Sequence, residues 1–172
     1  PRAWVEKVNY KGLKKVKEEY VHKIVNLEKR QCFKQSYLTK ARGELQKSGL
    51  FASTNPTIPK TTNADGSVPI TCNLTERKFR SIKAGVSYGT DLGLGAKFGW
   101  ENRNYFGSGE GLKVDSFINR DEQIVELNYV EPFYRRRDQK LILGSKFENK
   151  KSKAFNNIES SVFGFLEREL TP

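Results

Sequence analysis

Residues 92–101 read Leu-Gly-Leu-Gly-Ala-Lys-Phe-Gly-Trp-Glu, and this alternation decides the fold of the C-terminal half of the chain. Side chains of a β-strand point alternately to its two faces. One face therefore carries Leu92, Leu94, Ala96, Phe98 and Trp100, and the other carries three glycines, Lys97 and Glu101. Strands of this kind build a sheet with one apolar and one polar face, which is typical of the wall of a membrane β-barrel.

The same alternation recurs in about six segments, at roughly 80–90, 92–104, 111–119, 122–131, 139–149 and 157–168. Short polar or glycine-containing connections join them, which predicts an antiparallel meander. Six strands are too few to close a barrel, so we expect the N-terminal part of a larger transmembrane barrel. The first strand places Ile82, Ala84, Val86 and Tyr88 on one face, with Gly85 and Gly89 on the other.

Composition is compatible with such a wall. The 172 residues are 36% hydrophobic and carry a formal net charge of +11. No window approaches the ~20 consecutive apolar residues of a spanning helix, but a spanning strand needs only ~10. Lys and Arg are scattered along the chain, which argues against a nucleic-acid groove. Because the chain begins at Pro1 and has no Met, we expect its natural N-terminus and any export signal to lie outside it.

Residues 1–79 follow a different pattern. Alternation over 4–10, ending near Gly12, predicts a strand whose two faces carry Trp4, Glu6, Val8, Tyr10 and Val5, Lys7, Asn9. A first helix is predicted from apolar residues at helical spacing, namely Val16, Tyr20, Val21, Ile24 and Leu27. A second helix is expected to begin after an N-cap at Ser36 and to end at Gly49.

Two short strands, at 51–58 and 68–75, follow the helices, and Asp65-Gly66 predicts a hairpin turn between them. Proline removes a ladder donor, so Pro56 and Pro59 place the earlier strand at a sheet edge. This possible edge strand comprises Phe51, Pro56, Ile58 and Pro59. The predicted domain is therefore α+β, with strand-helix-helix-strand-strand order and both helices on one face of a three-stranded sheet.

Aromatic residues gather where alternate barrel strands end. Trp100, Tyr105 and Phe106 follow the second strand, and Tyr129, Phe133 and Tyr134 follow the fourth. In a meander these two turns lie on the same side of a membrane, so the clusters predict one interfacial aromatic girdle. The alternative, that they fill the core of a soluble sandwich, explains their number but not their position.

Catalytic chemistry finds little support. His22 is the only histidine and is expected to face solvent from a helix. Gly107-Ser108-Gly109-Glu110-Gly111 lacks the Lys-Ser/Thr of a phosphate-binding loop and joins two strands. Cys32 and Cys72 are too few for a metal site, with Cys72 either a core residue or one half of a disulfide. We expect no enzyme activity and no metal or other cofactor.

Several modest motifs, in order, resemble a known family over essentially the whole chain. Lys11-Gly12-Leu13 through Leu45, Gly49-Leu50-Phe51, the Asp65-Gly66 turn and Glu76-Arg77 resemble a POTRA domain, the periplasmic polypeptide-transport module. The segments 82–90, 100–110 and 129–133 resemble the opening strands of the BamA and TamA outer-membrane assembly proteins. The turn Arg103-Asn104-Tyr105-Phe106-Gly107 leans towards TamA. The resemblance implies a last POTRA domain over 1–79 and the first strands of a sixteen-stranded barrel over 80–172.

The resemblance also implies a function. Such proteins insert β-barrel or autotransporter clients into the bacterial outer membrane, with the POTRA domain in the periplasm; the outer membrane of an endosymbiotic organelle is the alternative location. Implied partners are unfolded outer-membrane clients, outer-membrane lipid and an inner-membrane-anchored or lipoprotein partner, whereas nucleic acid is disfavoured. The implied lateral gate lies at the first barrel strand: Ile82, Ala84, Gly85, Val86, Tyr88 and Gly89.

Other readings stay open. The glycines of that strand either ease bending at a seam or relieve crowding in the barrel wall. Arg135-Arg136-Arg137 and Lys150-Lys151-Ser152-Lys153 suit a basic module that binds anionic lipid or nucleic acid. A two-partner secretion transporter of the same superfamily is a further alternative.

Overall fold

The computed structural model describes residues 4–27, 32, 34–58, 63, 67–90, 93–151 and 155–170. The chain forms two compact units, which are described separately. The first comprises Pro1–Lys78 together with Gly107–Gly109, and the second comprises Phe79–Phe106 and Glu110–Pro172. Within the described residues, no helix is both long and apolar enough to cross a membrane.

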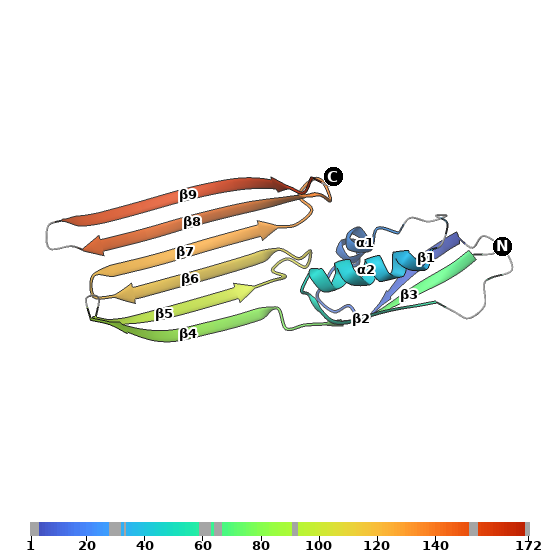
Figure 1. Cartoon of the computed structure of the whole chain (residues 1–172), viewed down its shortest axis with the longest axis horizontal. Helices are drawn as coiled ribbons and strands as arrows, with labels where there is room; N and C mark the ends of the chain where they lie inside the picture. The colour runs from blue at the N-terminus through green and yellow to red at the C-terminus, as the bar shows by residue number, and fades with distance from the viewer. Residues whose placement is uncertain are drawn as a thin grey trace. The chain divides into compact units, whose positions relative to one another are not determined.

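The first unit has the predicted β-α-α-β-β order (Figure 1). Its elements are β1 (Trp4–Lys11), α1 (Glu18–Val25), α2 (Gln35–Lys47), β2 (Phe51–Thr57) and β3 (Ser67–Glu76). The three strands form one sheet in the order β1-β3-β2, with β3 parallel to β1 and antiparallel to β2. The expectation that the proline-containing strand lies at an edge is therefore correct.

The core of this unit lies on one face of the sheet. Alternate residues of β3 are almost fully buried, whereas the residues between them are half-buried or exposed. The helices bury Tyr20, Val21, Ile24 and Leu45, and α2 packs beside β2. Burying an aliphatic side chain of this size contributes about 1.5–3 kcal/mol, so packing stabilises helices that are short on their own.

Two local expectations for the first unit are wrong. The register between β1 and β3 shifts between Val5 and Val8, so both valines are buried although strict alternation put them on opposite faces. Helix α2 begins at Gln35 after an extended Lys34 that makes no side-chain cap hydrogen bond, so Ser36 lies inside the first turn. Gly49 follows the helix with φ +71°, the left-handed conformation expected of a glycine at that end.

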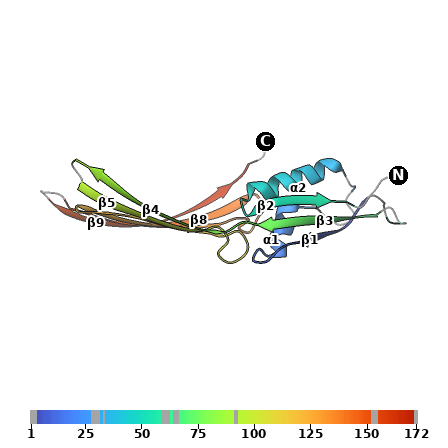
Figure 2. The ribbon, with the colours of Figure 1, turned by 90° about the horizontal axis from the view of Figure 1, so that it is seen from below.

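The second unit is a six-stranded antiparallel sheet in sequence order, as predicted (Figure 1). Its strands are β4 (Arg80–Gly89), β5 (Gly93–Asn102), β6 (Gly111–Asn119), β7 (Glu122–Glu131), β8 (Gln139–Lys151) and β9 (Asn156–Arg168). The sheet is curved but not closed (Figure 2). Most strand ends lie within about two residues of those expected, although Leu92 and the Asp65-Gly66 turn lie outside the described residues.

Candidate functional site: a two-faced wall with a free first strand

The register of the second unit separates apolar from polar side chains. Ile82 lies opposite Trp100, which lies opposite Val114, and Val114 lies opposite Leu127. Directly opposed residues share a face of the sheet. The exposed apolar side chains of this face include Val86 at 83% and Tyr88 at 78% exposure. An exposed apolar surface of this extent is normally in contact with another molecule. The hydrocarbon of a lipid bilayer suits the apolar face of strands that alternate in this way.

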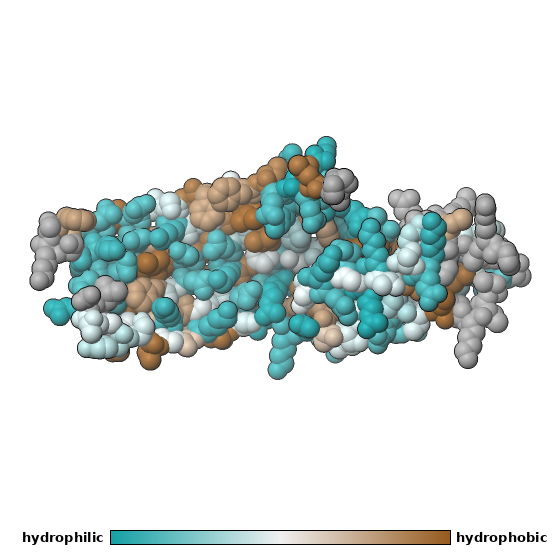
Figure 3. Space-filling view, in the orientation of Figure 1, coloured by the Kyte–Doolittle hydropathy of each residue, from teal (hydrophilic) through white to brown (hydrophobic). Residues whose placement is uncertain are grey.

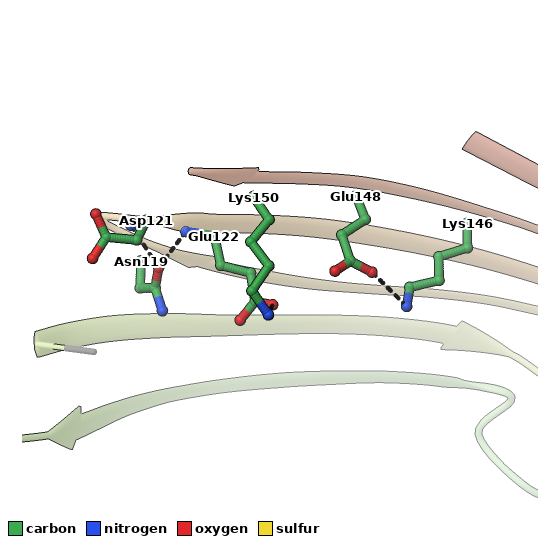
Figure 4. A network of polar contacts seen from close by, with 6 residues as sticks. All are labelled: Asn119, Asp121, Glu122, Lys146, Glu148 and Lys150. Carbon is green, nitrogen blue, oxygen red and sulfur yellow. Dashed lines mark hydrogen bonds and ion pairs between the residues drawn. The ribbon is translucent and has the colours of Figure 1, made fainter. Parts of the chain in front are cut away.

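The opposite face is largely hydrophilic. It is turned to the viewer in Figure 3, where hydrophobic atoms gather mainly along the β8–β9 side. Figure 4 shows part of its polar network: Lys146 Nζ lies 2.8 Å from Glu148 Oε2, and Lys150 Nζ lies 3.3 Å from Glu122 Oε1. Beside these pairs, Asn119 Oδ1 accepts the backbone N–H groups of Asp121 and Glu122 and so shapes the β6–β7 turn.

An open hollow of about 560 Å³ lies over β4, β5, β6 and β7. Most of its lining residues belong to the polar face, including Lys83, Gly85, Lys97, Gly99 and Glu126. Lys97 Nζ lies 5.5 Å from the ring centroid of Phe117, which places a cation over an aromatic ring. Of the two lining glycines, Gly85 has open space above its backbone, whereas the Asp115 carboxylate lies over Gly99.

Strand β4 has a partner on one side only. It pairs with β5 from Arg80 opposite Asn102 to Gly89 opposite Gly93, and no described strand pairs with its other edge. The six predicted gate residues all lie in this strand. A Cβ built at Gly85 has no heavy atom within 4 Å, so crowding within the described sheet does not explain that glycine. A free edge presents unpaired N–H and C=O groups to any extended chain.

The predicted girdle residues lie at one end of the sheet. Trp100 and Tyr105 form an edge-to-face pair with centroids 6.4 Å apart, and Tyr105 stacks similarly on Phe106 at 4.8 Å. Tyr129 lies near the end of β7, and Phe133 and Tyr134 lie in the turn that follows it. Both turns close the end of the meander at which β4 begins.

The predicted edge of the first unit is less uniform. Phe51 is 2% exposed and belongs to the core, whereas Pro56 pairs opposite Cys72 and Ile58 is exposed. Pro59 lies outside the described residues. Of the three described residues expected to present this edge, Pro56 and Ile58 are accessible and Phe51 is not.

Cys72 and His22 lie where the sequence predicted them, Cys72 in the core and His22 facing solvent. Both thiols are free, so the disulfide alternative is wrong, and Cys72 is buried in the core while Cys32 is exposed. Burial raises the pKa of the Cys72 thiol to about 11. His22 is exposed, with Nδ1 3.2 Å from the Tyr10 hydroxyl, and no metal-ligand group is found among the described side chains.

Sequence reasoning missed a clamp that holds the loop between β1 and α1. The Glu76 carboxylate accepts backbone N–H groups from Lys14 at 2.7 Å, Lys15 at 3.0 Å and Val16 at 2.9 Å. Burial opposes ionisation, but these hydrogen bonds outweigh it and hold the pKa of Glu76 below its usual value. The glutamate is some sixty residues from its donors, so no local pattern reveals the contact.

Comparison with known proteins agrees with this geometry. Residues 4–77 match the POTRA family model described as "Surface antigen variable number repeat". A putative outer membrane protein assembly factor of Treponema pallidum is 26% identical over 77% of this chain and 16% of its own length. The outer membrane protein assembly factor BamA of Buchnera aphidicola is 24% identical over 77% of this chain and 22% of its own length.

A solved structure extends the likeness to the fold. The crystal structure of BamA from Haemophilus ducreyi lacking POTRA domains 1–3 matches 94% of this chain and 31% of that chain, with TM-score 0.79 and 23% sequence identity. The described strands thus have the arrangement of a POTRA domain followed by the first strands of a barrel. The chain spans about a fifth of the length of the curated relatives it matches.

Proposed function

We propose that this chain supplies a periplasmic POTRA domain and the first wall strands of a barrel that inserts client β-barrels into the outer membrane. The POTRA match over residues 4–77 and the similarity to BamA-type outer-membrane assembly factors support this proposal. Residues 1–79 form the POTRA part and residues 80–172 the wall part of this proposal. The observation that carries it is the six-stranded antiparallel sheet with an exposed apolar face, which follows a unit of β-α-α-β-β order.

The mechanism begins with the backbone of an entering client strand. In hydrocarbon each unsatisfied N–H or C=O group costs several kcal/mol, so an unpaired strand enters lipid only at great cost. A barrel that opens beside its first strand offers the free edge of β4 as a template, and the client pairs with it before meeting lipid. The residues of this lateral gate are Ile82, Ala84, Gly85, Val86, Tyr88 and Gly89.

Side chains of β4 suit this role. Ile82, Val86 and Tyr88 are exposed on the apolar face and are ready to contact lipid or a client's own apolar face. Gly85 and Gly89 remove side chains from the other face, which lowers the cost of bending the strand away from a weak seam. Charged side chains are what normally protect a free edge, and among residues 82–89 only Lys83 carries one.

A disulfide lock tests the gate. The full-length protein carries Cys32→Ser and Cys72→Ser, together with Ser87→Cys and a second introduced cysteine in the final barrel strand. Oxidation joins these two cysteines in a disulfide bond, and client insertion into liposomes is then measured. The proposal expects insertion to stop when the bond forms and to return on reduction. The matched control joins β4 to β5 through Val86→Cys and Ala96→Cys, which face each other in the register and leave the seam free. Normal insertion by the seam-locked protein refutes the gate.

The POTRA edge has a separate test. Strand β2 is an edge that an extended client could join, although Pro56 limits pairing there. Two roles compete for this domain: capture of clients by strand addition, and a steric or hinge role. Replacing Pro56 and Pro59 with threonine is expected to tighten client binding, measured with a labelled client peptide, if the edge is used. Unchanged affinity favours the steric or hinge role.

A further inference from the structure

The turn between β7 and β8 has an unusual shape. Its residues 132–138 read Pro-Phe-Tyr-Arg-Arg-Arg-Asp. Phe133 has φ +54° and Arg135 has φ +56°, a left-handed conformation that non-glycine residues adopt only when their surroundings hold them there. The backbone supplies part of that support, since Tyr134 N–H donates to Gln139 C=O at 2.9 Å and Gln139 N–H donates to Arg136 C=O at 3.3 Å.

The positive charge of this turn is only partly neutralised. Asp138 accepts a hydrogen bond from Arg168 Nε at 2.5 Å, and Lys140 Nζ lies 3.0 Å from Glu167. These neighbouring acids are therefore engaged mainly by cations outside the run of three arginines, although the charge of Arg136 also attracts the Asp138 carboxylate. Arg135 and Arg136 are exposed, and among the described residues neither has an acidic side chain within ion-pair distance. The guanidinium of Arg135 lies 5.4 Å from the centroid of the Tyr134 ring, which holds it as a cation–π pair.

The turn borders the apolar band of the wall. It follows the end of β7, where Tyr129 lies opposite Leu112 and Leu143 on the apolar face. Phe133 and Tyr134 are half-buried, and the arginines beyond them are exposed. Aromatic rings at the boundary with arginines just outside it match the order of layers in a bilayer, where hydrocarbon gives way to phosphate headgroups.

We propose that the β7–β8 turn binds the phosphate groups of anionic phospholipids in the leaflet at this end of the wall, with Arg135 and Arg136 as ligands and Tyr134 as the platform that positions Arg135. A guanidinium suits this role because its planar fork of donors matches phosphate oxygens. The inference rests on the wall spanning a bilayer, as the proposed function requires. It goes beyond that function by assigning a lipid class and the residues that select it.

Retention of lipid by the full-length protein tests the site. The protein is reconstituted in nanodiscs that contain phosphatidylcholine and a minority of phosphatidylglycerol, and native mass spectrometry counts the lipids that stay bound. We expect preferential retention of phosphatidylglycerol. Removing both charges with R135Q/R136Q is expected to weaken that preference roughly thirtyfold at low salt, whereas R135K/R136K keeps most of it. Equal retention by the wild type and R135Q/R136Q overturns the proposal.

Two controls distinguish loss of this lipid site from two other causes, namely a change in the net charge of the protein and failure of the barrel to insert. R120Q/K151Q removes the same charge from exposed residues at the opposite end of the sheet and is expected to leave the preference unchanged. A loss as large as that of R135Q/R136Q shows that net charge alone is responsible and overturns the proposal. Heat-modifiable mobility on a gel reports barrel insertion independently, so a wall that fails to insert contradicts the proposed function and not merely the lipid site. Tighter binding of a DNA oligonucleotide than of phosphatidylglycerol by Arg135 and Arg136 also overturns it.

Discussion

The ring of Phe163 on β9 lies over Gly144 on β8, directly opposite it in the register. A Cβ built at Gly144 lies 2.2 Å from Phe163 Cζ, so the ring occupies the space that a side chain at residue 144 requires. An aromatic ring that covers a bare glycine shields the backbone of both strands and pins their register. This pair therefore joins β8 to β9 on the largely hydrophilic face, within its more apolar β8–β9 side.

The first prediction concerns this pair. Gly144→Ala displaces the ring and Phe163→Ala uncovers the glycine, and each is expected to destabilise the wall by about 1 kcal/mol. The double variant lacks the clash, so its loss is expected to be smaller than the sum of the two. A double-mutant cycle of urea unfolding in lipid vesicles measures the coupling. Additive losses contradict the packing.

The second prediction uses two glycines of the first unit. Gly12 has φ +91°, and a Cβ there meets the Leu74 carbonyl oxygen at 2.0 Å, so Gly12→Ala is expected to cost roughly 2–4 kcal/mol. Gly43 lies in α2 with nothing within 4 Å of its Cβ, so Gly43→Ala is expected to stabilise by about 0.5–1 kcal/mol. Unfolding followed by the helical circular-dichroism signal checks both. The same chemical change thus has opposite signs at the two positions.

The third prediction concerns acid stability. Because the folded-state pKa of Glu76 is lowered, its clamp contributes stability above the ordinary value of 4.5, and this contribution is lost as pH falls through the folded-state pKa. Glu76→Gln is therefore expected to be less stable than the wild type at neutral pH. The difference is expected to shrink in acid when unfolding midpoints are compared across this range. A difference that is constant with pH contradicts the role of the charge.

The fourth prediction separates the two faces of the wall. Leu127 is exposed in the middle of β7 on the apolar face, and the adjacent Asn128 points to the polar face. Leu127→Arg is expected to destabilise the inserted protein by about 2–4 kcal/mol, the cost of a cation in hydrocarbon. Asn128→Arg is expected to change stability far less. Unfolding from vesicles measures both, and equal costs contradict a lipid-facing apolar surface.

The fifth prediction concerns thiol chemistry. Cys32 is exposed, whereas Cys72 is buried with a thiol pKa of about 11, so little thiolate forms at neutral pH. Brief treatment with iodoacetamide is expected to label Cys32 and spare Cys72, as read by peptide mass spectrometry. Denaturant is expected to expose both. Rapid labelling of Cys72 in the native protein contradicts its place in the core.

Much of this architecture could be predicted because its signals are local. Period-two alternation and short connections identify β4 to β9, and the same reasoning places Cys72 in the core. The register of β1 could not be predicted in this way, because it depends on pairing residue 4 with residue 67 and on a shift that buries both Val5 and Val8. The Glu76 clamp and the contact of the Phe163 ring with Gly144 could not be predicted from the sequence for the same reason. Each joins residues whose proximity exists only after folding.

The meander also has a consequence for the order of folding. From β5 to β8, both neighbours of each strand are the strands next to it in sequence, so these ladders need only short loops to close and can form early. Pairing of β1 with β3 closes a far longer stretch of chain and is expected to lag. The outer edges of β4 and β9 have no partner among the described strands, so these short loops close neither edge. Under the proposed function, the second partner of β4 comes from a distant segment or from a client chain, so this edge is the last part of the strand to pair.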